Sequence, residues 1–335
     1  MATVLTIGGA RFIGRFTVRE FLHRGDEVTL FSRGKTDDPF GDRVDRVRGD
    51  RKDEDDLREA AAAVGPDVVV DFAAYQPADV RTATTVFDDV DAYVYVSSTS
   101  AYEWSSIPLR EDDTPLMSCA PEQARDDSHE TYGRRKAEGD RALFEAADRG
   151  VDAMSVRPTA IYGPHDYTER QDYWIDRVNR FDRIAVPGDE YWMPIHLGYV
   201  EDVARAIRIV AERGEPGEAY NVASRDQCRL VDLIEHVANA LNTSVTVAHA
   251  SRRDLAAVGL SPEDFSLCRS YPSFVSTAKL ADLGWTSTPY EEGWAGAVEA
   301  SLETDSDGTQ HGPDRDTEER LLETISGSVH RIDGR

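Results

Sequence analysis

Two residues near the middle of the chain, Tyr132 and Lys136, have the types and the spacing for acid–base chemistry. The surrounding pattern predicts a helix, and residues four positions apart lie on one face of a helix. An ammonium beside a phenol favours the phenolate, which lets Tyr132 donate and accept a proton near neutral pH. Arg134 and Arg135 stand beside this lysine in a chain with only four lysines, which favours a role for a compact ammonium. A pair of surface neighbours is the alternative interpretation.

A glycine-rich segment (GGARFIG) follows the first predicted strand, Val4–Ile7, and opens the first predicted helix. At such a turn the helix-terminal N–H groups hold phosphate, and glycine lets the backbone approach a pyrophosphate. Arg11 stands where a dinucleotide fingerprint normally has a further glycine, so a tight turn without a ligand remains the alternative. The candidate binding residues here are Gly8, Gly9, Arg11, Phe12, Ile13 and Gly14.

The elements that position these residues alternate between β-rich runs and helical patterns over residues 1–163. This alternation predicts an α/β fold, a doubly wound parallel sheet of the Rossmann type. The predicted strands are Val4–Ile7, Glu27–Phe31, Val44–Arg48, Val68–Ala73, Ala92–Ser97 and Ala153–Val156. The predicted helices are Phe12–His23, stopped by Gly25, a helix capped by Asp53 that runs to Val64, and Glu130–Asp148.

Residues 164–302 have a more irregular pattern, which predicts a small mixed α/β substrate cap together with returning elements of the Rossmann domain. Residues 303–335 are acidic and poor in apolar side chains, which predicts a largely disordered tail. Some polar and aromatic residues are candidates to line a substrate pocket, although each alone is more often a packing or surface residue. They are Arg157, His165, Asp166, Arg170, Tyr173, Trp174 and His196.

Three motifs occur in order along the chain: the glycine segment, YVSSTSAY (Tyr95–Tyr102), and Tyr132 with Lys136. Together they resemble the short-chain dehydrogenase/reductase superfamily, on its extended, sugar-nucleotide epimerase/dehydratase side. The GGxxxxG form resembles an atypical subgroup that includes relatives of the chloroplast stem-loop-binding proteins. The resemblance covers residues 3–302 and continues through RPTAIYGP, IHLGYVEDVARAI, GEAYNVAS and KLADLGW.

The resemblance implies a catalytic role for three residues, Ser98, Tyr132 and Lys136. Ser98 would hydrogen-bond the substrate oxygen that Tyr132 protonates or deprotonates, and Lys136 would also hold the nicotinamide ribose. A serine that satisfies the local backbone at a strand end is the alternative for Ser98.

The resemblance also implies four further cofactor contacts. Asp50 matches a residue that reads adenine, although an exposed loop aspartate is the alternative in so acidic a chain. Ala73 and Ala74 match small residues that let a strand backbone approach the cofactor, or else they only pack in the core. Pro158, in RPTAIYGP, is the remaining candidate.

Two departures from the family pattern bear on the reaction. Ser32 and Arg33 stand where a carboxylate would hold the ribose 2′-hydroxyl of NAD, so Arg33 with Arg11 favours NADP over NAD. The alternative is that both arginines are solvated surface residues that bind no phosphate. Thr99 and Ser100 replace the Asp-Glu pair with which 4,6-dehydratases move protons, which argues against sugar dehydration.

Amino-acid composition bears on the partners, the metal and disulfide content and the cellular setting of the protein. The 335 residues carry 38 Lys and Arg against 63 Asp and Glu, a net charge of −25, which makes nucleic acid an unlikely partner. Acid excess with lysine scarcity indicates a salt-rich cytosol, or else an ordinary acidic protein from a high-GC genome. The three cysteines have no paired spacing, so we expect no disulfide framework. The histidines are isolated and lack metal-ligand spacing, so we expect no metal site. With no leader or long apolar run, we expect a cytoplasmic protein without a membrane span.

The sequence therefore predicts an NAD(P)-dependent oxidoreductase of the sugar-nucleotide epimerase/dehydratase type, working as an epimerase or reductase on a small molecule, in particular a nucleotide-linked sugar. An RNA-binding or nuclease role and a non-catalytic NADP-sensing regulator are the alternatives. We also expect a homodimer formed by helices near Asp79–Phe87 and Tyr132–Phe144. Its apolar contacts would come from Ala83, Val86, Phe87, Ala137, Leu143 and Phe144.

Overall fold

A computed structural model describes residues 1–36, 38–188, 195–269, 274–304 and 306–334. The chain divides into two compact units. The first comprises Met1–Ala160, Val200–Ala223 and Val275–Ser287, so the chain returns to it twice. The second comprises Ile161–Tyr199, Ser224–Phe274 and Thr288–Arg335.

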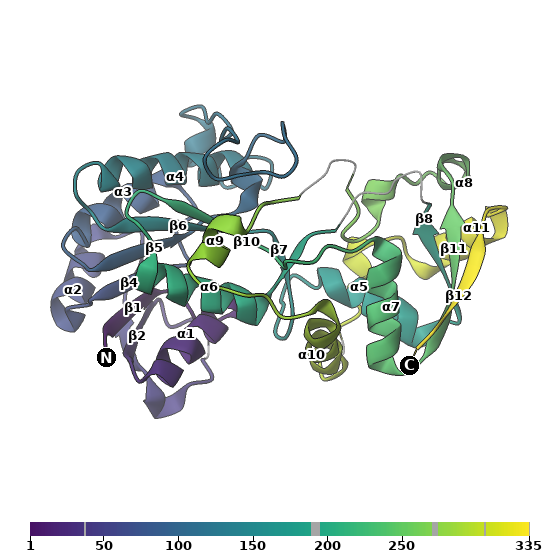
Figure 1. Cartoon of the computed structure of the whole chain (residues 1–335), viewed down its shortest axis with the longest axis horizontal. Helices are drawn as coiled ribbons and strands as arrows, with labels where there is room; N and C mark the ends of the chain where they lie inside the picture. Colours follow the sequence, from purple (N-terminus) through teal and green to yellow (C-terminus); the bar gives the residue numbers. More distant parts are fainter. Residues whose placement is uncertain (37, 189–194, 270–273, 305, 335) are drawn as a thin grey trace. The chain divides into compact units, whose positions relative to one another are not determined.

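The first unit is built on a seven-stranded parallel sheet with the order β10-β6-β5-β4-β1-β2-β3 (Figure 1). The strand order reverses between β1 and β4, and ligands of such sheets bind beyond the carboxyl ends of the strands at this point. The predicted doubly wound fold is confirmed, and β10 is the strand that was not predicted. The strands are β1 (Thr3–Ile7), β2 (Glu27–Ser32), β3 (Asp45–Arg48), β4 (Val68–Asp71), β5 (Ala92–Val96), β6 (Ala153–Pro158) and β10 (Ala219–Val222).

Helices cover both faces of this sheet, with α1 against α6 on one face and α3 against α4 on the other (Figure 1). Two helix ends follow from local chemistry that was predicted. Gly25 ends α1 in the left-handed conformation with φ 82°, and the Asp53 side chain accepts the N–H of Asp55 at 3.0 Å to begin α2. The helices are α1 (Phe12–Arg24), α2 (Glu54–Val64), α3 (Pro77–Val86), α4 (Tyr132–Ala147), α6 (Val200–Arg213) and α9 (Ala278–Asp282). Short 3-10 turns are η1 (Gly41–Arg43), η2 (Thr99–Ala101) and η3 (Gln123–Arg125).

The second unit has a mixed α/β architecture. In its three-stranded sheet the central β11 (Ser244–Ala250) pairs parallel with β8 (Arg183–Pro187) and antiparallel with β12 (Val329–Asp333). A two-stranded sheet joins β7 (Ala160–Tyr162) to β9 (Leu197–Tyr199). The helices are α5 (Arg170–Arg180), α7 (Leu230–Leu241), α8 (Arg252–Ala257), α10 (Tyr290–Leu302) and α11 (Arg315–Thr324), with the 3-10 turns η5 (Pro262–Asp264) and η6 (Thr309–His311).

The C-terminal segment differs from the largely disordered tail that composition predicted. Its helix α11 buries Leu321 and Leu322, and β12 buries Ile332 while it pairs with β11. Leu321, Leu322 and Ile332 lie on the inner faces of their elements, although Val329 of β12 is exposed, so a few well-placed apolar residues are sufficient for packing. Composition alone does not detect such placement.

Helices α3 and α4 offer a smaller apolar surface than the predicted homodimer assumed. Ala83, Phe87, Ala137 and Leu143 are buried within the single chain. Val86 and Phe144 are half-buried. The remaining surface is charged, with Arg81 Nη2 3.0 Å from Glu138 Oε1 across the two helices.

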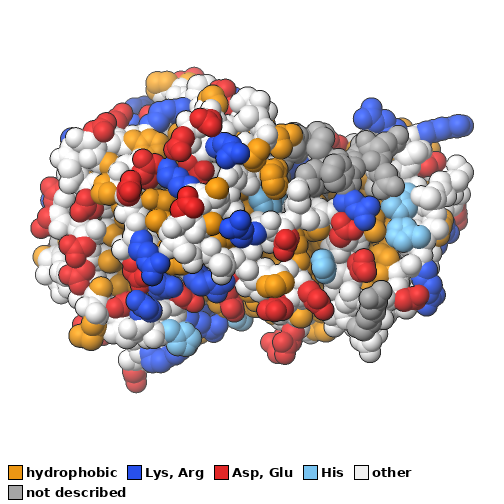
Figure 2. All heavy atoms as spheres, in the orientation of Figure 1, with side chains coloured by type: hydrophobic (Ala, Val, Ile, Leu, Met, Phe, Trp, Pro, Cys, Tyr) orange, Lys and Arg blue, Asp and Glu red, His pale blue; other side chains and the backbone are white. Residues whose placement is uncertain are grey.

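The surface reflects the charge of the sequence: Figure 2 shows acidic and basic side chains intermingled on the visible face. Among the described residues, no helix combines the length and the apolar character that crossing a membrane requires.

Candidate active site

The glycine segment after β1 forms a tight turn, in which a side chain on Gly9 or Gly14 would overlap neighbouring atoms. Gly8 and Gly9 have φ values of 90° and 104°, which favour glycine. A Cβ on Gly14 would overlap the backbone of Gly9, so the start of α1 lies directly against the turn. The first turn of α1 contains no acidic residue. These features fit the predicted pyrophosphate site, because N–H groups and the positive end of the helix dipole lie at a turn whose glycines carry no side chains.

The end of β4 lies beside this turn, as predicted for Ala73 and Ala74. A Cβ on Gly8 would lie 3.9 Å from the Cβ of Ala73. The Ala73 N–H donates to Asp71 Oδ1 at 2.9 Å, and Ala74 is fully buried. The structure thus brings Gly8 and Ala73 together at the point where the strand order reverses.

The other residues of the glycine segment differ in exposure. Arg11 is exposed at the N-cap of α1, Phe12 is buried with a positive φ of 33°, and Ile13 is half-buried. Phe12 therefore holds the turn in the core, whereas Arg11 extends to the surface.

The turn after β2 contains more positive charge than the sequence indicated. Arg33 is exposed, and the Ser32 hydroxyl accepts the N–H of Gly34 at 3.2 Å. A Cβ on Gly34 would lie 2.9 Å from Nε of Arg48, so a second guanidinium packs over this turn. Arg48, at the end of β3 and paired with Ser32, was not among the predicted site residues.

Asp50 and Pro158 lie at the ends of β3 and β6. The Asp50 carboxylate accepts the N–H of Lys52 at 3.0 Å, which is a local turn contact. Pro158 is buried and pairs with Val222 of β10. Both residues thus lie at the carboxyl edge of the sheet, where ligands of such sheets bind.

Lys136 is the most constrained of the predicted catalytic residues. The residue is 2% exposed, and its ammonium donates to the carbonyl oxygens of Ala74 at 2.9 Å and Val96 at 2.8 Å. These carbonyls follow β4 and end β5, so Lys136 ties α4 to both strand ends. Its Nζ lies 5.9 Å from the ring centre of Tyr132 and 4.7 Å from that of Tyr95.

Burial lowers the pKa of Lys136 to about 8, and the carboxylates of Asp71 and Asp140 limit the decrease. The side chain therefore retains its positive charge at neutral pH while it lies beneath the half-buried phenol of Tyr132. A buried cation in this position favours the phenolate over the phenol.

Ser98 caps the short η2 turn after β5, where its hydroxyl accepts the N–H of Ser100 at 3.1 Å. Accepting this bond leaves the hydroxyl proton available for a second contact. The start of α4 packs against the same turn, because a Cβ on Gly133 would overlap the carbonyl oxygen of Ser100. Ser98 and Tyr132 are thus carried by backbone segments in direct contact. Gly133, next to Tyr132 in the sequence, permits this close approach, which the spacing of Tyr132 and Lys136 alone does not indicate.

A buried charge cluster surrounds Asp71 at the end of β4, and it was not predicted from the sequence. Arg51 forms an ion pair with Asp71, and its Nη1 lies 3.3 Å from Asp79 Oδ1. The Tyr93 hydroxyl donates to Asp71 at 3.0 Å. The signal was Asp71 itself, a single carboxylate in an otherwise apolar strand, which requires a buried partner.

Several predicted pocket residues of the second unit instead pack in its core. Tyr173 and Trp174 are fully buried, and the Trp174 indole donates to the Ser266 carbonyl at 2.8 Å. A ring nitrogen of His196 lies 2.6 Å from the Ser224 carbonyl, and burial lowers the pKa of His196 to about 4. His196 is therefore neutral at physiological pH. Arg157 belongs to the first unit, where its Nε lies 2.9 Å from Asp140.

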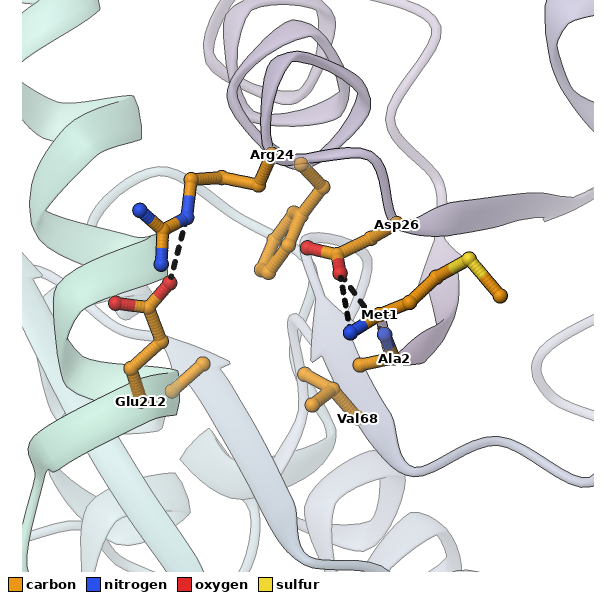
Figure 3. A pocket seen from close by; sticks show the side chains of 8 residues that line it. Met1, Ala2, Arg24, Asp26, Val68 and Glu212 are labelled. Carbon is orange, nitrogen blue, oxygen red and sulfur yellow. Dashed lines mark hydrogen bonds and ion pairs between the residues drawn. The ribbon is translucent and has the colours of Figure 1, made fainter.

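A pocket of about 250 Å³ lies at the amino ends of the strands, opposite the edge that carries these residues (Figure 3). Arg24 Nε lies 3.5 Å from Glu212 Oε1 at its rim. It is lined by Met1, Ala2, Phe21, Arg24, Asp26, Val68, Ala211 and Glu212. Because the glycine turn and Lys136 are at the carboxyl ends, this pocket is not part of the candidate site.

Residues 4–223, about two thirds of the chain, match the NAD dependent epimerase/dehydratase family. The chain belongs to this family. The match contains every predicted catalytic and cofactor-binding residue.

One curated relative and two solved structures illustrate what the chain is similar to. The chloroplast stem-loop binding protein of 41 kDa b from Arabidopsis thaliana is 30% identical over 66% of this chain and 58% of its own length. The chain thus spans little more than half of that relative.

The UDP-glucose 4-epimerase of Thermotoga maritima, solved with UDP-glucose, has a TM-score of 0.70 at 18% identity, covering 90% of this chain and 99% of its own. The dTDP-glucose 4,6-dehydratase of Bacillus anthracis, solved with NAD, has a TM-score of 0.69 at 17% identity, covering 90% and 97%. These two structures share the epimerase/dehydratase fold.

Proposed function

We propose that this protein is an NAD(P)-dependent epimerase or reductase that acts on a hydroxyl-bearing carbon of a nucleotide-linked sugar. The observation that carries the proposal is the buried ammonium of Lys136, held by two strand-end carbonyls beneath Tyr132. Desolvating a cation is costly, and this cation has no carboxylate within ion-pair distance among the described residues. Such a placement is typical of a residue whose charge serves chemistry.

The residues present fit a dinucleotide. The glycine turn places no side chain over the backbone at the start of α1, and Ala73 has only a small side chain at the adjoining strand end. The turn would hold the pyrophosphate, Asp50 the adenine, and Lys136 the nicotinamide ribose. When bound, a nicotinamide supplies the ability to accept and return a hydride.

The chain itself supplies proton transfer and orientation. Tyr132 removes or returns the proton of the substrate hydroxyl, with the Lys136 ammonium stabilising its phenolate form. The Ser98 hydroxyl donates a hydrogen bond to the same substrate oxygen and so fixes the carbon that exchanges hydride.

Nucleotide sugars are the favoured substrate class because relatives that share the fold act on them by name, as with UDP-glucose and dTDP-glucose. Dehydration is not proposed. Thr99 is buried in η2 and Ser100 follows it, so neither of the positions after Ser98 carries the carboxyl group that a 4,6-elimination uses. The family match does not favour the alternative of RNA binding, and a sensor without turnover does not need a buried Lys136 beneath Tyr132.

NADP is the favoured cofactor, because Arg33 and Arg48 gather at the turn after β2 and Arg11 is exposed at the start of α1. A 2′-phosphate bonded by one or two guanidinium groups gains affinity that the 2′-hydroxyl of NAD does not.

We also propose a homodimer with α3 and α4 in contact with a second copy, through the half-buried Val86 and Phe144. Light scattering in molar salt tests it, since salt screens the charge of −25. We expect about twice the chain mass of 37.2 kDa, and a monomer would contradict the proposal.

The test of the function is to incubate the protein with NAD⁺ or NADP⁺ and either UDP-glucose or dTDP-glucose, and to follow the sugar by NMR. We expect an epimer or a keto sugar from the wild type and none from Tyr132→Phe. Product from both proteins at equal rates would show that Tyr132 is not the acid–base group.

A further inference from the structure

One buried carboxylate, Asp140, accepts hydrogen bonds from three side chains. Its Oδ2 accepts from Ser97 Oγ at 3.1 Å and from Arg157 Nε at 2.9 Å, and its Oδ1 accepts from Ser155 Oγ at 2.6 Å. All four side chains are 3% exposed or less. Bonds of this kind in the interior fix the geometry of every group that they join.

These bonds lead to the turn that carries Ser98. Ser97 directly precedes Ser98, the residue that caps η2. Arg157 also donates through Nη1 to the hydroxyl of Tyr102 at 2.7 Å, and Tyr102 ends η2. The Asp140–Arg157 pair therefore holds the η2 turn at both ends.

Asp140 itself belongs to the helix that carries the other two catalytic candidates. It follows Lys136 by four residues and Tyr132 by eight, so the three side chains lie on one face of α4. We propose that Asp140 is a positioning residue, whose carboxylate fixes the turn bearing Ser98 relative to Tyr132 and Lys136. This inference rests on the proposed function.

The charge of Asp140 has a second consequence, for Lys136. Burial lowers the pKa of Lys136 and Arg135 lowers it further, while Asp71, Asp140 and Asp79 raise it. The side chains that face the ammonium come from β4, α3, β5, the loop after β4 and α4. They are Asp71, Asp79, Tyr95, Tyr75, Tyr132, Arg135 and Asp140. Loss of the Asp140 charge therefore moves the deprotonation of Lys136 to lower pH.

Two buried serines provide a matched test, because each donates one hydrogen bond to the same carboxylate. Ser97→Ala removes the bond that joins Asp140 to the residue before Ser98, whereas Ser155→Ala removes a bond that joins Asp140 of α4 to β6 and does not reach η2. Amide hydrogen exchange at Ser100 and Ala101 reports the order of η2, since their N–H groups donate to Ser98. Turnover of UDP-glucose or dTDP-glucose with NAD⁺ or NADP⁺ reports its effect on chemistry.

For Ser97→Ala we expect at least tenfold faster exchange at these amides and about a tenfold lower kcat, with the KM for the nicotinamide cofactor unchanged. Ser155→Ala should change exchange and kcat less than threefold, at a similar loss of thermal stability. Equal effects of the two variants on exchange would overturn the proposal, whether or not either sugar is turned over.

Asp140→Asn adds a readout that a structural role alone would not move. We expect a lower kcat and an alkaline limb of the pH–rate profile displaced to lower pH, whereas Ser97→Ala should keep the wild-type limb. An unshifted limb in Asp140→Asn would contradict the role of its charge. Full turnover by Tyr132→Phe would instead refute the proposed function and leave the exchange contrast as the test of positioning.

Discussion

Each unit of the protein buries an arginine–carboxylate pair, and the two pairs hold different segments. In the first unit Arg157 Nε lies 2.9 Å from Asp140, and in the second Arg177 Nε lies 2.9 Å from Glu318. All four side chains are almost inaccessible to solvent. The first pair is bonded to segments that carry Ser98 and Tyr132. The second fastens α11 to α5 and to β8, where Glu318 also accepts the N–H of Ala185 at 2.9 Å.

The comparison shows that a buried ion pair does not by itself identify a functional site. Both pairs have similar geometry and both require compensation for lost solvation. The difference is in the groups that surround them: a buried lysine beneath a half-buried tyrosine in the first unit, and aromatic rings that stack on Arg177 and Arg315 in the second.

The largest effect on stability is expected from Glu318→Gln. The change removes one of the two carboxylates that pair with the buried Arg177, while Asp176 remains 3.1 Å from its Nη1. The expected loss is therefore at the lower end of the about 3 to 5 kcal/mol that removal of one partner of a buried pair costs. Urea unfolding followed by hydrogen exchange at Ala185 should show this loss, with cofactor affinity within about twofold of the wild type.

Glu323→Gln, on the same helix but exposed, is the control and should change stability by less than about 0.5 kcal/mol. If Glu318→Gln abolished cofactor binding as well, the separation of the two pairs by role would be wrong.

Lys136→Met should have the opposite pattern, with stability lowered modestly and turnover lowered about a hundredfold, because Tyr132 loses the charge that supports its phenolate. Steady-state rates and thermal melts on one preparation measure both. A variant with normal turnover would mean that the ammonium only fills the core.

The wild type offers a related pH test. Since burial brings the pKa of Lys136 to about 8, the ammonium is present below that pH and is lost above it. We therefore expect turnover to fall as pH rises through about 8. The Lys136→Met profile should lack this limb.

A smaller effect, confined to one cofactor, is expected from Arg33→Ala. Removing a guanidinium that pairs with a 2′-phosphate costs about 1.5 to 3 kcal/mol of NADP binding and leaves NAD nearly unaffected. Calorimetric titration with both cofactors measures it. Equal losses for NAD and NADP, or no loss for either, would remove the basis for the NADP preference.

The sequence predicted the first unit well because its signals are local. Gly25 and Asp53 act on their own helix ends, and the alternation of strands and helices requires no knowledge of distant partners. The spacing of Tyr132 and Lys136 is local for the same reason. Contacts between residues far apart in the sequence could not be predicted. Asp140 contacts Ser97 and Ser155, which lie in two other elements, and no sequence pattern links the three residues.

The second unit was less predictable because its order depends on a few well-placed side chains. Leu321 and Glu318 are fully buried in a segment whose composition resembles that of a disordered chain. The Glu318 carboxylate is matched by Arg177, far away in the sequence, so its burial could not be anticipated. The pairing of β12 with β11 likewise depends on a distant strand.

The most direct test of the central claim is the comparison of Tyr132→Phe with the wild type in turnover and in cofactor affinity. For Tyr132→Phe we expect kcat to fall by about 10² to 10⁴ while the Kd for the cofactor changes no more than a few-fold. The reason is that the phenol moves a proton and does not hold phosphate. Retention of wild-type turnover by Tyr132→Phe would contradict it.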